Sequence, residues 1–368
     1  MGRSALVHLI AAARPNFMKV APLYHALRAD PAFDARIVHT GQHYDANMSD
    51  AFFRDLGLPE AQHHLGIGSG SHAEQTGRVM IAYERIALQE RPDWTVVVGD
   101  VNSTAGVALV CAKLLLPVAH LEAGLRSGDR TMPEEINRLV TDAIADLLWT
   151  PSADGDENLL REGVPAARIE RVGNIMIDSF EMLRERIEQD GTRAALGLEG
   201  KRFGVVTLHR PSNVDDAAVL ADIVSQLRTA AESLALVFPV HPRTRKQLQE
   251  FGLHDELARA PGIRLVEPLG YIQFMSLVTR AALAITDSGG VQEETTYLGI
   301  PCLTIRSNTE RPVTVSEGTN RLLAPADTLG AIRRVLAGEW PRGRRPALWD
   351  GQAAARCVAS LRRRVAAD

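Results

Sequence analysis

Short runs of β-branched and aliphatic residues alternate with amphipathic segments along almost the whole chain, and this alternation restricts the possible folds most. The run Trp94–Val98 is followed by a helical pattern over Ser103–Leu115 and then by a second run, Val118–Leu121. Such βαβα alternation predicts parallel sheets with helices on both faces. Further predicted strands are Ala5–Ile10, Ala35–Thr40, Phe203–Leu208, Ala235–Val240, Ile263–Val266, Leu283–Thr286 and Pro301–Ile305, and further predicted helices are Phe17–Leu27, Ala73–Ala87, Val219–Ala231 and Leu329–Leu336.

The alternation occurs twice, which indicates two domains. One round ends near residue 170 and the next begins near Phe203. A length of 368 residues is sufficient for two domains of ordinary size. We therefore expect an α/β protein with two Rossmann-like, doubly wound domains, formed by residues 1–170 and 171–349. A Pro/Gly/Arg-rich stretch at 341–346 precedes a final helical pattern, and we expect a helix within 350–368 to return to the first domain.

Composition argues against a nucleic-acid-binding, disulfide-stabilised or membrane-spanning protein. A net charge of −4 and a pI of about 6.3 give no support for a nucleic-acid or membrane-surface partner. Three widely spaced cysteines, Cys111, Cys302 and Cys357, fit neither a disulfide framework nor a zinc site. No apolar run approaches the roughly 18 residues of a membrane span, and the N-terminal run is too short for a signal peptide. A cytoplasmic protein is the simplest interpretation.

Three acidic residues lie where predicted strands end or a predicted helix begins. Asp100 follows the strand that ends at Val98, Glu122 follows Val118–Leu121, and Glu134 lies in the helical turn that starts at Pro133. In an open parallel sheet, the carboxyl ends of the strands form the ligand crevice. Burial and neighbouring charges can separate the pKa values of carboxylates in such a crevice, so that they share proton transfers. These three acids are therefore candidate catalytic groups.

A candidate anion site follows the predicted strand Leu283–Thr286. Ser288, Gly289 and Gly290 precede a helix, where glycine allows close approach of a phosphate and free backbone N–H groups attract anions. Glu294, about one turn further on, is better suited to ribose hydroxyls than to phosphate. A tight strand–helix turn without a ligand is the alternative interpretation, and a lone Gly-Gly pair does not decide between the two.

Cations and histidines follow other predicted strands. Arg14 and Lys19 come after the first strand and can bind a diphosphate, although Lys19 alone would suit a solvated helix face. That loop lacks Gly-x-Gly-x-x-Gly, so no dinucleotide cofactor is indicated. A lone histidine is usually structural, but two at successive strand ends favour a site. Further candidates for binding an anionic or nucleotide ligand are His209, Arg210, His241 and Arg311.

Two acidic or histidine clusters are not interpreted as metal sites. Asp154 and Asp156 fit the first turn of a helix, where the helix dipole favours acids. His63 and His64 lie in a predicted polar loop without partner ligands. We therefore expect no metal ion and no cofactor.

Taken together, these motifs resemble the UDP-N-acetylglucosamine 2-epimerase family. The His-x-Glu-Ala-Gly-Leu-Arg stretch at 120–126, followed by Pro-Glu-Glu-x-Asn-Arg at 133–138, is similar to the non-hydrolysing branch. The other matching segments run in family order along nearly the whole chain: Arg14-Pro15 with Lys19 and Ala21–Leu23, Thr40–Tyr44, Gly99–Ser103, Val172–Asn174, Thr207–Arg210, His241–Thr244, Asp287–Glu294 and Asn308–Pro312.

The resemblance implies the glycosyltransferase-B architecture, in which two Rossmann-like domains face a cleft, and a cytoplasmic homodimer that needs no metal. Residues that match positions around the reacting sugar and diphosphate are Arg14, Lys19, Asp100, Glu122, Glu134 and His209. Residues that match the UDP site are Ser288, Gly289, Gly290, Glu294 and Arg311. Tyr271 and Phe274 fall where the family holds the uracil.

The chain departs from the family pattern at two places. Ala12 and Ala13 stand where Gly-Thr is frequent, and the segment 68–76 lacks the Arg-Gln pair of members that have an allosteric UDP-N-acetylglucosamine site. The second departure is similar to another branch of the family. We therefore do not extend allosteric activation to this chain.

The resemblance implies reversible epimerisation at C2 of a UDP-2-acetamido sugar, through elimination of UDP to a 2-acetamidoglucal and its re-addition. UDP-N-acetylglucosamine is the first expected substrate, and modified 2-acetamido sugars remain open. A hydrolysing 2-epimerase that releases N-acetylmannosamine and UDP is one alternative. A glycosyltransferase of the same fold would need only one base, and a non-catalytic sugar-nucleotide sensor would need none of the three acids.

Overall fold

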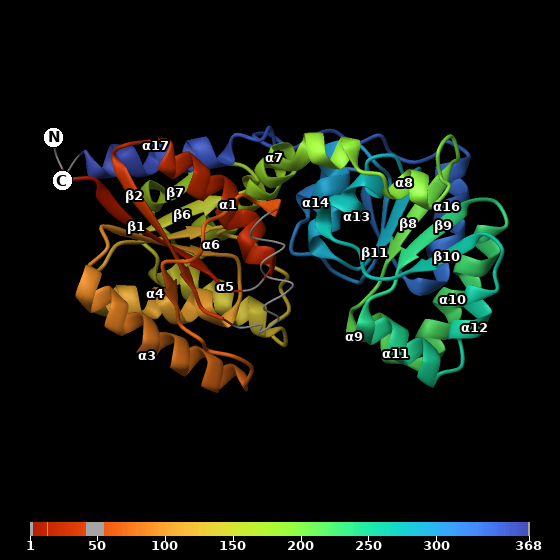
Figure 1. Ribbon diagram of the computed structural model, residues 1–368, viewed down its shortest axis with the longest axis horizontal. Coiled ribbons are helices and arrows are strands. Elements are labelled where there is room, and N and C mark those ends of the chain that lie inside the picture. The colour runs from red at the N-terminus through yellow and green to blue at the C-terminus, as the bar shows by residue number, and fades with distance from the viewer. Residues whose placement is uncertain (1–2, 13, 42–54, 367–368) are drawn as a thin grey trace. The chain divides into compact units, whose positions relative to one another are not determined.

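The computed structural model describes residues 3–12, 14–41 and 55–366. The chain divides into two compact units, shown in Figure 1. The first contains Met1–Met182 and Ala347–Asp368, and the second contains Leu183–Pro346. The residues around 170 therefore belong to the first unit, and the start of the second unit lies within helix α7 (Ile175–Gln189).

The first unit is built on a seven-stranded sheet with strand order β3-β2-β1-β4-β5-β6-β7. All of its strand pairs are parallel, as the alternation of strands and helices predicts. The strands are β1 (Ala5–Ala11), β2 (Phe33–His39), β3 (His63–His64), β4 (Trp94–Val98), β5 (Val118–Leu121), β6 (Leu147–Thr150) and β7 (Ile169–Arg171). The helices are α1 (Arg14–Arg28), α3 (His72–Glu90), α4 (Asn102–Leu114), α5 (Pro133–Ile144), α6 (Ala153–Arg161), the 3₁₀ turn η1 (Ala166–Arg168), α7 and α17 (Ala353–Val365).

The second unit repeats the plan with a six-stranded parallel sheet of order β10-β9-β8-β11-β12-β13. Its strands are β8 (Phe203–Thr207), β9 (Ala235–Pro239), β10 (Ile263–Val266), β11 (Leu283–Thr286), β12 (Cys302–Ile305) and β13 (Asn320–Leu323). Its helices are α8 (Thr192–Ala195), α9 (Pro211–Val214), α10 (Ala217–Ala231), α11 (Pro242–Glu250), α12 (His254–Ala258), α13 (Tyr271–Val278), α14 (Gly289–Leu298), α15 (Val313–Ser316), η2 (Pro325–Asp327) and α16 (Thr328–Leu336). The predicted fold class, two Rossmann-like α/β halves, is confirmed.

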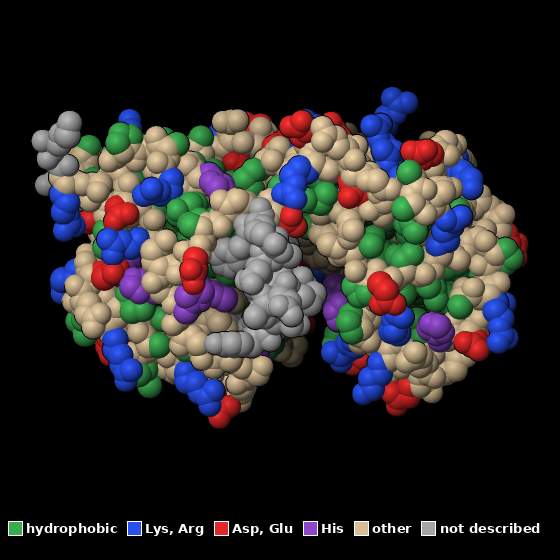
Figure 2. Space-filling model, in the orientation of Figure 1, with side chains coloured by type: hydrophobic (Ala, Val, Ile, Leu, Met, Phe, Trp, Pro, Cys, Tyr) green, Lys and Arg blue, Asp and Glu red, His purple; other side chains and the backbone are tan. Residues whose placement is uncertain are grey.

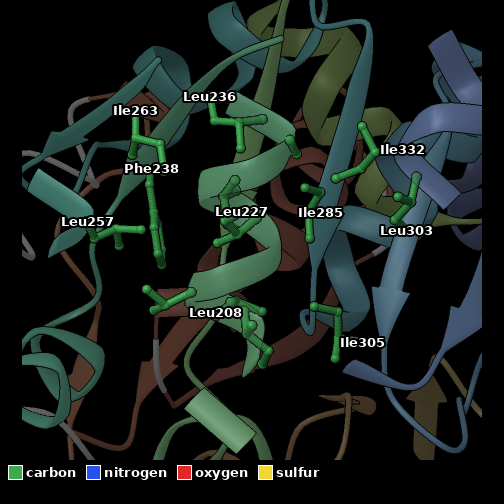
Figure 3. Packing of buried hydrophobic residues seen from close by; sticks show 14 of the residues in the cluster. Leu208, Leu227, Leu236, Phe238, Leu257, Ile263, Ile285, Leu303, Ile305 and Ile332 are labelled. Atoms are coloured by element: carbon green, nitrogen blue, oxygen red, sulfur yellow. The ribbon is translucent and has the colours of Figure 1, made fainter. Parts of the chain in front are cut away.

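Aliphatic side chains fill the space between sheet and helices in the second unit. Figure 3 shows Leu227 of α10 packed among residues of the central strands, including Leu236 and Phe238 of β9 and Ile285 of β11. All four are at most 2% exposed. Burial of this kind is the main favourable contribution to folding, and it fixes the strand ends from which the polar loops project.

Strand register places the candidate residues of each unit at one edge of its sheet. In the first unit, Val98 of β4 pairs with Leu121 of β5, so the loops that start at Gly99 and Glu122 leave the sheet side by side. In the second unit, Thr207 of β8 pairs with Thr286 of β11. The segments after these two strands therefore also begin next to each other.

The C-terminal helix α17 is part of the first unit, where it packs against α1 (Figure 1). The Asp178 carboxylate accepts hydrogen bonds from the backbone N–H groups of Ala353 and Ala354, at 3.1 and 2.8 Å. The indole N–H of Trp149 donates to the Ser360 hydroxyl at 3.0 Å. These contacts fasten the start and the middle of α17 to the sheet side of the unit.

The charged side chains and the cysteines lie where the composition leads us to expect them. Figure 2 shows basic and acidic side chains interspersed over the visible face of each unit, in line with totals of 41 basic and 45 acidic residues. Cys111, Cys302 and Cys357 are all buried free thiols. Burial raises the pKa of Cys111 and of Cys302 to about 11. No helix in the described ranges is long and apolar enough to span a membrane.

Candidate functional site

A buried ion pair lies at the carboxyl edge of the first sheet. The Lys19 ammonium, on α1, binds the carboxylate of Glu122, which follows β5. Both residues are buried. Gly99 lies beside the pair: its φ angle of 67° favours glycine, and a Cβ atom there would lie 3.4 Å from Lys19 Nζ and 3.5 Å from Glu122 Oε2, within ordinary contact distance. A buried charge pair needs close compensation, so this lysine and glutamate depend on each other.

The backbone at Glu122 has a conformation that is rare for a residue with a side chain. Its φ angle is 75°, in the left-handed region. The N–H groups of Glu122 and Ala123 both donate to the Trp149 carbonyl at 3.1 Å, and the Gly124 N–H donates to Asp142 Oδ2 at 3.0 Å. Strain of this kind persists only where the surroundings enforce it, and it is concentrated at functional sites.

Asp100 lies in the loop after β4, next to the ion pair. Its side chain is 35% exposed, and Arg138 Nη1 binds its Oδ2 at 2.5 Å. The Asn137 amide donates to the Asp100 carbonyl at 2.9 Å, so that the first turns of α5 fix this loop. Glu134 is half-buried on the first turn of α5, and its side chain makes no hydrogen bond to the residues that the structure describes. The carboxylates of Asp100, Glu122 and Glu134 thus come from neighbouring elements of one sheet edge.

Arg14 begins α1, but its side chain lies outside the described part of the structure. The motif Thr40–Tyr44 is described only as far as Gly41. Thr40 is fully buried, and its hydroxyl accepts a hydrogen bond from Ser103 at 2.9 Å.

His209, which follows β8, is held by Asp287, a residue that the sequence analysis did not select. Asp287 is fully buried directly after β11, and its Oδ1 lies 2.9 Å from His209 Nδ1. It also accepts hydrogen bonds from the N–H groups of His209 and Arg210 and from the Asn213 amide. Burial would raise the pKa of Asp287, but His209 and these donors outweigh it and lower the pKa. The His209 side chain remains 39% exposed, so its ring is available to a ligand.

The two histidines at successive strand ends lie together. The ring centroids of His209 and His241 are 5.5 Å apart. His241 caps α11 by accepting the Arg243 N–H at 3.2 Å. Partial burial and the neighbouring His209 lower the pKa of His241, so His241 is predominantly neutral at pH 7 and can both donate and accept.

The Ser-Gly-Gly turn begins α14, as the sequence predicts. Ser288 is its N-cap residue, and a Cβ atom at Gly290 would meet no atom within 4 Å. A Cβ atom at Gly289 would lie 2.7 Å from Arg311 Nη1, so Arg311 covers one side of the turn. The Arg311 guanidinium is held by Glu293 at 2.8 Å and by Glu310 at 3.1 Å. The turn combines free helix N–H groups with a fixed cation, which is an anion-binding arrangement.

Glu310 anchors the cations of this turn. Its carboxylate also binds Arg306 at 2.8 Å, and Arg210 Nη2 lies 3.6 Å away. Burial opposes ionisation of Glu310, but Arg311 and Arg306 outweigh it and lower its pKa to about 2. Arg210 Nε also donates to the Asp287 carbonyl at 3.1 Å, which fixes it beside the turn.

Glu294 is the most strongly perturbed acid of the second unit. It is 4% exposed in α14, and burial raises its pKa to about 8, with a smaller contribution from Glu293. The Tyr271 hydroxyl, at the start of α13, interacts with this carboxyl group and stabilises its ionised form. Phe274 is half-buried one turn further along α13. A buried carboxyl group with few partners is suited to ligand hydroxyls, and it is a functional-site signature.

The local structure predicted for the acidic pair Asp154 and Asp156 is confirmed, but that predicted for the histidine pair His63 and His64 is wrong. Asp154 and Asp156 lie in the first turn of α6, as predicted. His63 and His64 form the short edge strand β3 instead of a polar loop, because they pair with Val38 and His39 of β2. Within the described ranges, no group of three or more histidine, cysteine or acidic side chains is arranged to hold a metal ion.

Comparisons with known proteins extend over nearly the whole chain. A family model described as UDP-N-acetylglucosamine 2-epimerase matches residues 25–362. A curated UDP-N-acetylglucosamine 2-epimerase from Methanocaldococcus jannaschii is 44% identical over 86% of this chain and 87% of its own length. A UDP-2,3-diacetamido-2,3-dideoxy-D-glucuronate 2-epimerase from Pseudomonas aeruginosa is 39% identical over 96% and 98%.

Solved structures show the same similarity. The crystal structure of Methanocaldococcus jannaschii UDP-GlcNAc 2-epimerase in complex with UDP-GlcNAc and UDP has a TM-score of 0.87 at 41% sequence identity. It covers 97% of this chain and 99% of the relative. A putative UDP-N-acetylglucosamine 2-epimerase from Listeria monocytogenes has a TM-score of 0.89 at 30% identity and covers 98% of this chain and 96% of the relative.

Proposed function

Because the chain belongs to the UDP-N-acetylglucosamine 2-epimerase family, we propose that it reversibly inverts C2 of a UDP-2-acetamido sugar without hydrolysing it. The observation that carries this proposal is the strained, buried Glu122 beside Asp100 at one sheet edge. A carboxylate of this kind is expected where protons are moved, and inversion at C2 requires removal of a proton from one face and delivery to the other.

The reaction proceeds by elimination and re-addition. A carboxylate takes the C2 proton, the electron pair of the C2–H bond forms the C1–C2 double bond, and the C1–O bond breaks as UDP leaves. The intermediate is a 2-acetamidoglucal. UDP then adds back to C1 while an acid donates a proton to the opposite face of C2. Asp100, Glu122 and Glu134 are the candidate proton carriers, and the pairing of Glu122 with Lys19 makes Lys19 a candidate proton or charge partner.

The second unit supplies the groups suited to UDP. The N–H groups at Gly289 and Gly290, the Ser288 hydroxyl and the Arg311 guanidinium would stabilise the charge of the departing diphosphate. His209, held at Nδ1 by Asp287, would present its other nitrogen to the same group. Glu294 would accept ribose hydroxyls, and Tyr271 and Phe274 would hold the uracil. Arg14, Arg210 and His241 complete the proposed substrate-binding set.

Proton NMR in deuterated water tests the proposal. Incubated with UDP-N-acetylglucosamine alone, the protein should form UDP-N-acetylmannosamine that carries deuterium at C2. Free N-acetylmannosamine and UDP would instead indicate the hydrolysing reaction. UDP binding without turnover of any UDP sugar would indicate a sugar-nucleotide sensor. A product without deuterium at C2 would contradict the elimination route.

One relative suggests a second candidate substrate. The Pseudomonas protein, which acts by name on a 2,3-diacetamido uronate, matches a larger share of this chain than the 44%-identical relative does. The NMR assay should therefore include UDP-2,3-diacetamido-2,3-dideoxy-D-glucuronate. The substrate with the higher kcat/KM is the one to assign.

A homodimer and a cytoplasmic location follow from the family resemblance and are part of the same proposal. The outer face of α3 and the end of α4 expose Ile81, Leu88 and Leu115, at 59%, 52% and 88%. Ile81 and Leu88 are spaced i and i+7, which places them on one face of α3, and exposed apolar side chains on one face favour an interface. Light scattering coupled to size exclusion should give twice the monomer mass of 40.1 kDa, and a monomer mass would contradict the dimer.

A further inference from the structure

Helix α5 buries three of its four charged side chains and exposes an apolar one. Glu135, Arg138 and Asp142 are spaced i, i+3 and i+7, which places them on one face of the helix. They are 2%, 2% and 1% exposed, whereas Ile136 is 37% exposed. Burying charges costs free energy that well-packed apolar residues would not cost. This charged face of α5 therefore requires an explanation other than packing.

Arg138 connects the loops that follow β4 and β5. Its Nε and Nη2 donate to Glu135 Oε2 at 3.0 and 2.6 Å, and its Nη1 donates to Asp100 at 2.5 Å. Glu135 also accepts the N–H groups of Ser127 and Gly128, both at 3.0 Å. The planar fork of a guanidinium can engage two carboxylates in fixed directions, which a lysine cannot do. One carboxylate oxygen of Asp100 is thereby fixed, while its side chain stays 35% exposed.

Asp142 holds the turn at Glu122 from the same helix face. Its Oδ2 accepts the Gly124 N–H at 3.0 Å and binds Arg126 at 2.7 Å, while its Oδ1 lies 2.5 Å from His120 Nδ1. The other nitrogen of His120 lies 2.8 Å from the Gly99 carbonyl oxygen. Asp142 therefore contacts Gly124, two residues after Glu122, directly, and is linked through His120 to Gly99, the residue before Asp100.

We propose that Arg138 and Asp142 are positioning residues, which aim the carboxylates of Asp100 and Glu122 at the substrate without touching it. This inference rests on the proposed epimerase function. Misplacement of a reacting group by about 1 Å can cost about 100-fold in rate. Loss of either positioning residue should therefore reduce kcat while UDP binding, which depends on the second unit, is unchanged.

The experiment compares four variants with the wild type. Arg138→Met removes the guanidinium, and Arg138→Lys keeps only its charge. The double variant Glu135→Gln/Arg138→Met removes both buried charges, so that neither is left unpaired. Asp142→Asn keeps the shape but removes the charge. Arg36→Met is the control, because Arg36 is a half-buried arginine of the same unit that binds Glu90 and Asp34. The readouts are kcat, KM, deuterium incorporation at C2, UDP affinity by calorimetry and the unfolding temperature.

The positioning role predicts about a 100-fold loss of kcat and of deuterium incorporation in the Arg138→Met, double and Asp142→Asn variants. KM and UDP affinity should change less than about threefold, Arg138→Lys should recover part of the rate, and Arg36→Met should be unaffected. Folded variants with wild-type kcat would overturn the inference, as would equal losses of kcat and UDP affinity. If Arg138→Met does not fold, the double variant and Arg138→Lys decide. A wild type without C2 exchange would refute the epimerase proposal itself, which is a distinct result.

Discussion

Glu294 is the residue at which stability and ligand binding are expected to conflict. Its folded pKa of about 8 lies above the value of 4.5 for a free glutamate, so stability present at low pH is lost as the pH rises from about 4.5 through 8. Glu294→Gln has no charge to bury and should be more stable than the wild type above pH 8, by on the order of 3 kcal/mol. Its affinity for UDP should fall about tenfold, because a carboxylate acceptor for the ribose is lost.

Denaturant unfolding at pH 5 and pH 9, with calorimetric titration of UDP at pH 9, checks this expectation. The stability gap between variant and wild type should be small at pH 5 and large at pH 9. Equal gaps at the two pH values would show that Glu294 does not carry the raised pKa.

Asp100 is expected to carry a proton in the reaction. Asp100→Asn keeps the contact with Arg138 through its amide oxygen but cannot accept the C2 proton. It should lower kcat by about two to four orders of magnitude, with UDP affinity unchanged. Steady-state kinetics with UDP-N-acetylglucosamine measures the change, and a rate within threefold of the wild type would remove Asp100 from the catalytic set.

The sequence was enough to select candidate residues near predicted strand ends, whether half-buried like Asp100 or buried like Glu122, but not the residues that hold them in place. Asp100, His209 and Ser288 each lie two residues after the end of an apolar strand, and that position alone suggests a ligand edge. Arg138, Asp142 and Asp287 were not selected, although the quoted motifs contain Arg138 and Asp287. These three residues were missed because a charged side chain in a helix or directly after a strand is normally expected to be exposed to solvent, whereas here it is buried. A search for charged residues at i, i+3 and i+7 beside an exposed apolar residue would have found α5.

Among the elements, the strands β3, β6, β7 and β13 were missed. β4, β5, β10 and β11 were predicted with the bounds that the structure has. The strands β3, β7 and β13 contain two to four residues with few apolar side chains, and no periodicity can be recognised over such a length. β6 has the sequence Leu-Leu-Trp-Thr, is completely buried between β5 and β7, and is as compatible with a helix as with a strand.

The start of α17 is attached through one buried carboxylate. Asp178 binds the first N–H groups of the helix, and burial raises its pKa to about 6. Asp178→Ala should lower the free energy of unfolding by about 1–2 kcal/mol, as loss of a helix cap usually does. Asp178→Asn keeps an acceptor and should cost less. Denaturant unfolding at pH 7 gives the values, and limited proteolysis between 347 and 352 should be faster in Asp178→Ala. Wild-type behaviour of both variants would show that α17 is held by other contacts.

For the whole molecule, the resemblance that the motifs carry is confirmed by the family match over residues 25–362 and by solved structures that cover nearly the entire chain. The fold class was predictable because strand–helix alternation leaves few other arrangements. The boundary of the first unit was less predictable, because α7 passes from one unit to the other without a break in its helical pattern.

The two units are expected to respond differently to UDP. Trp340 is the single tryptophan of the second unit, whereas Trp94, Trp149 and Trp349 belong to the first. A ligand that binds the folded state raises its unfolding temperature. In a variant with the other three tryptophans replaced by Phe, Trp340 fluorescence reports the thermal unfolding of the second unit. Hydrogen exchange in the first sheet reports the unfolding of the first unit. UDP should therefore raise the unfolding temperature measured by Trp340 more than the one measured by hydrogen exchange. A larger shift in the first sheet would place the main UDP contacts there.

The burial of all three cysteines leaves the described surface without a reactive thiol. Maleimide dyes attack thiolates, and thiols with a pKa near 11 are almost entirely protonated at pH 7. A pair of introduced cysteines at exposed positions, such as Ser69→Cys in one unit and Glu256→Cys in the other, would therefore take up donor and acceptor fluorophores without prior removal of native residues. Energy transfer in single molecules would then measure whether the distance between the two labelled positions changes when UDP is added.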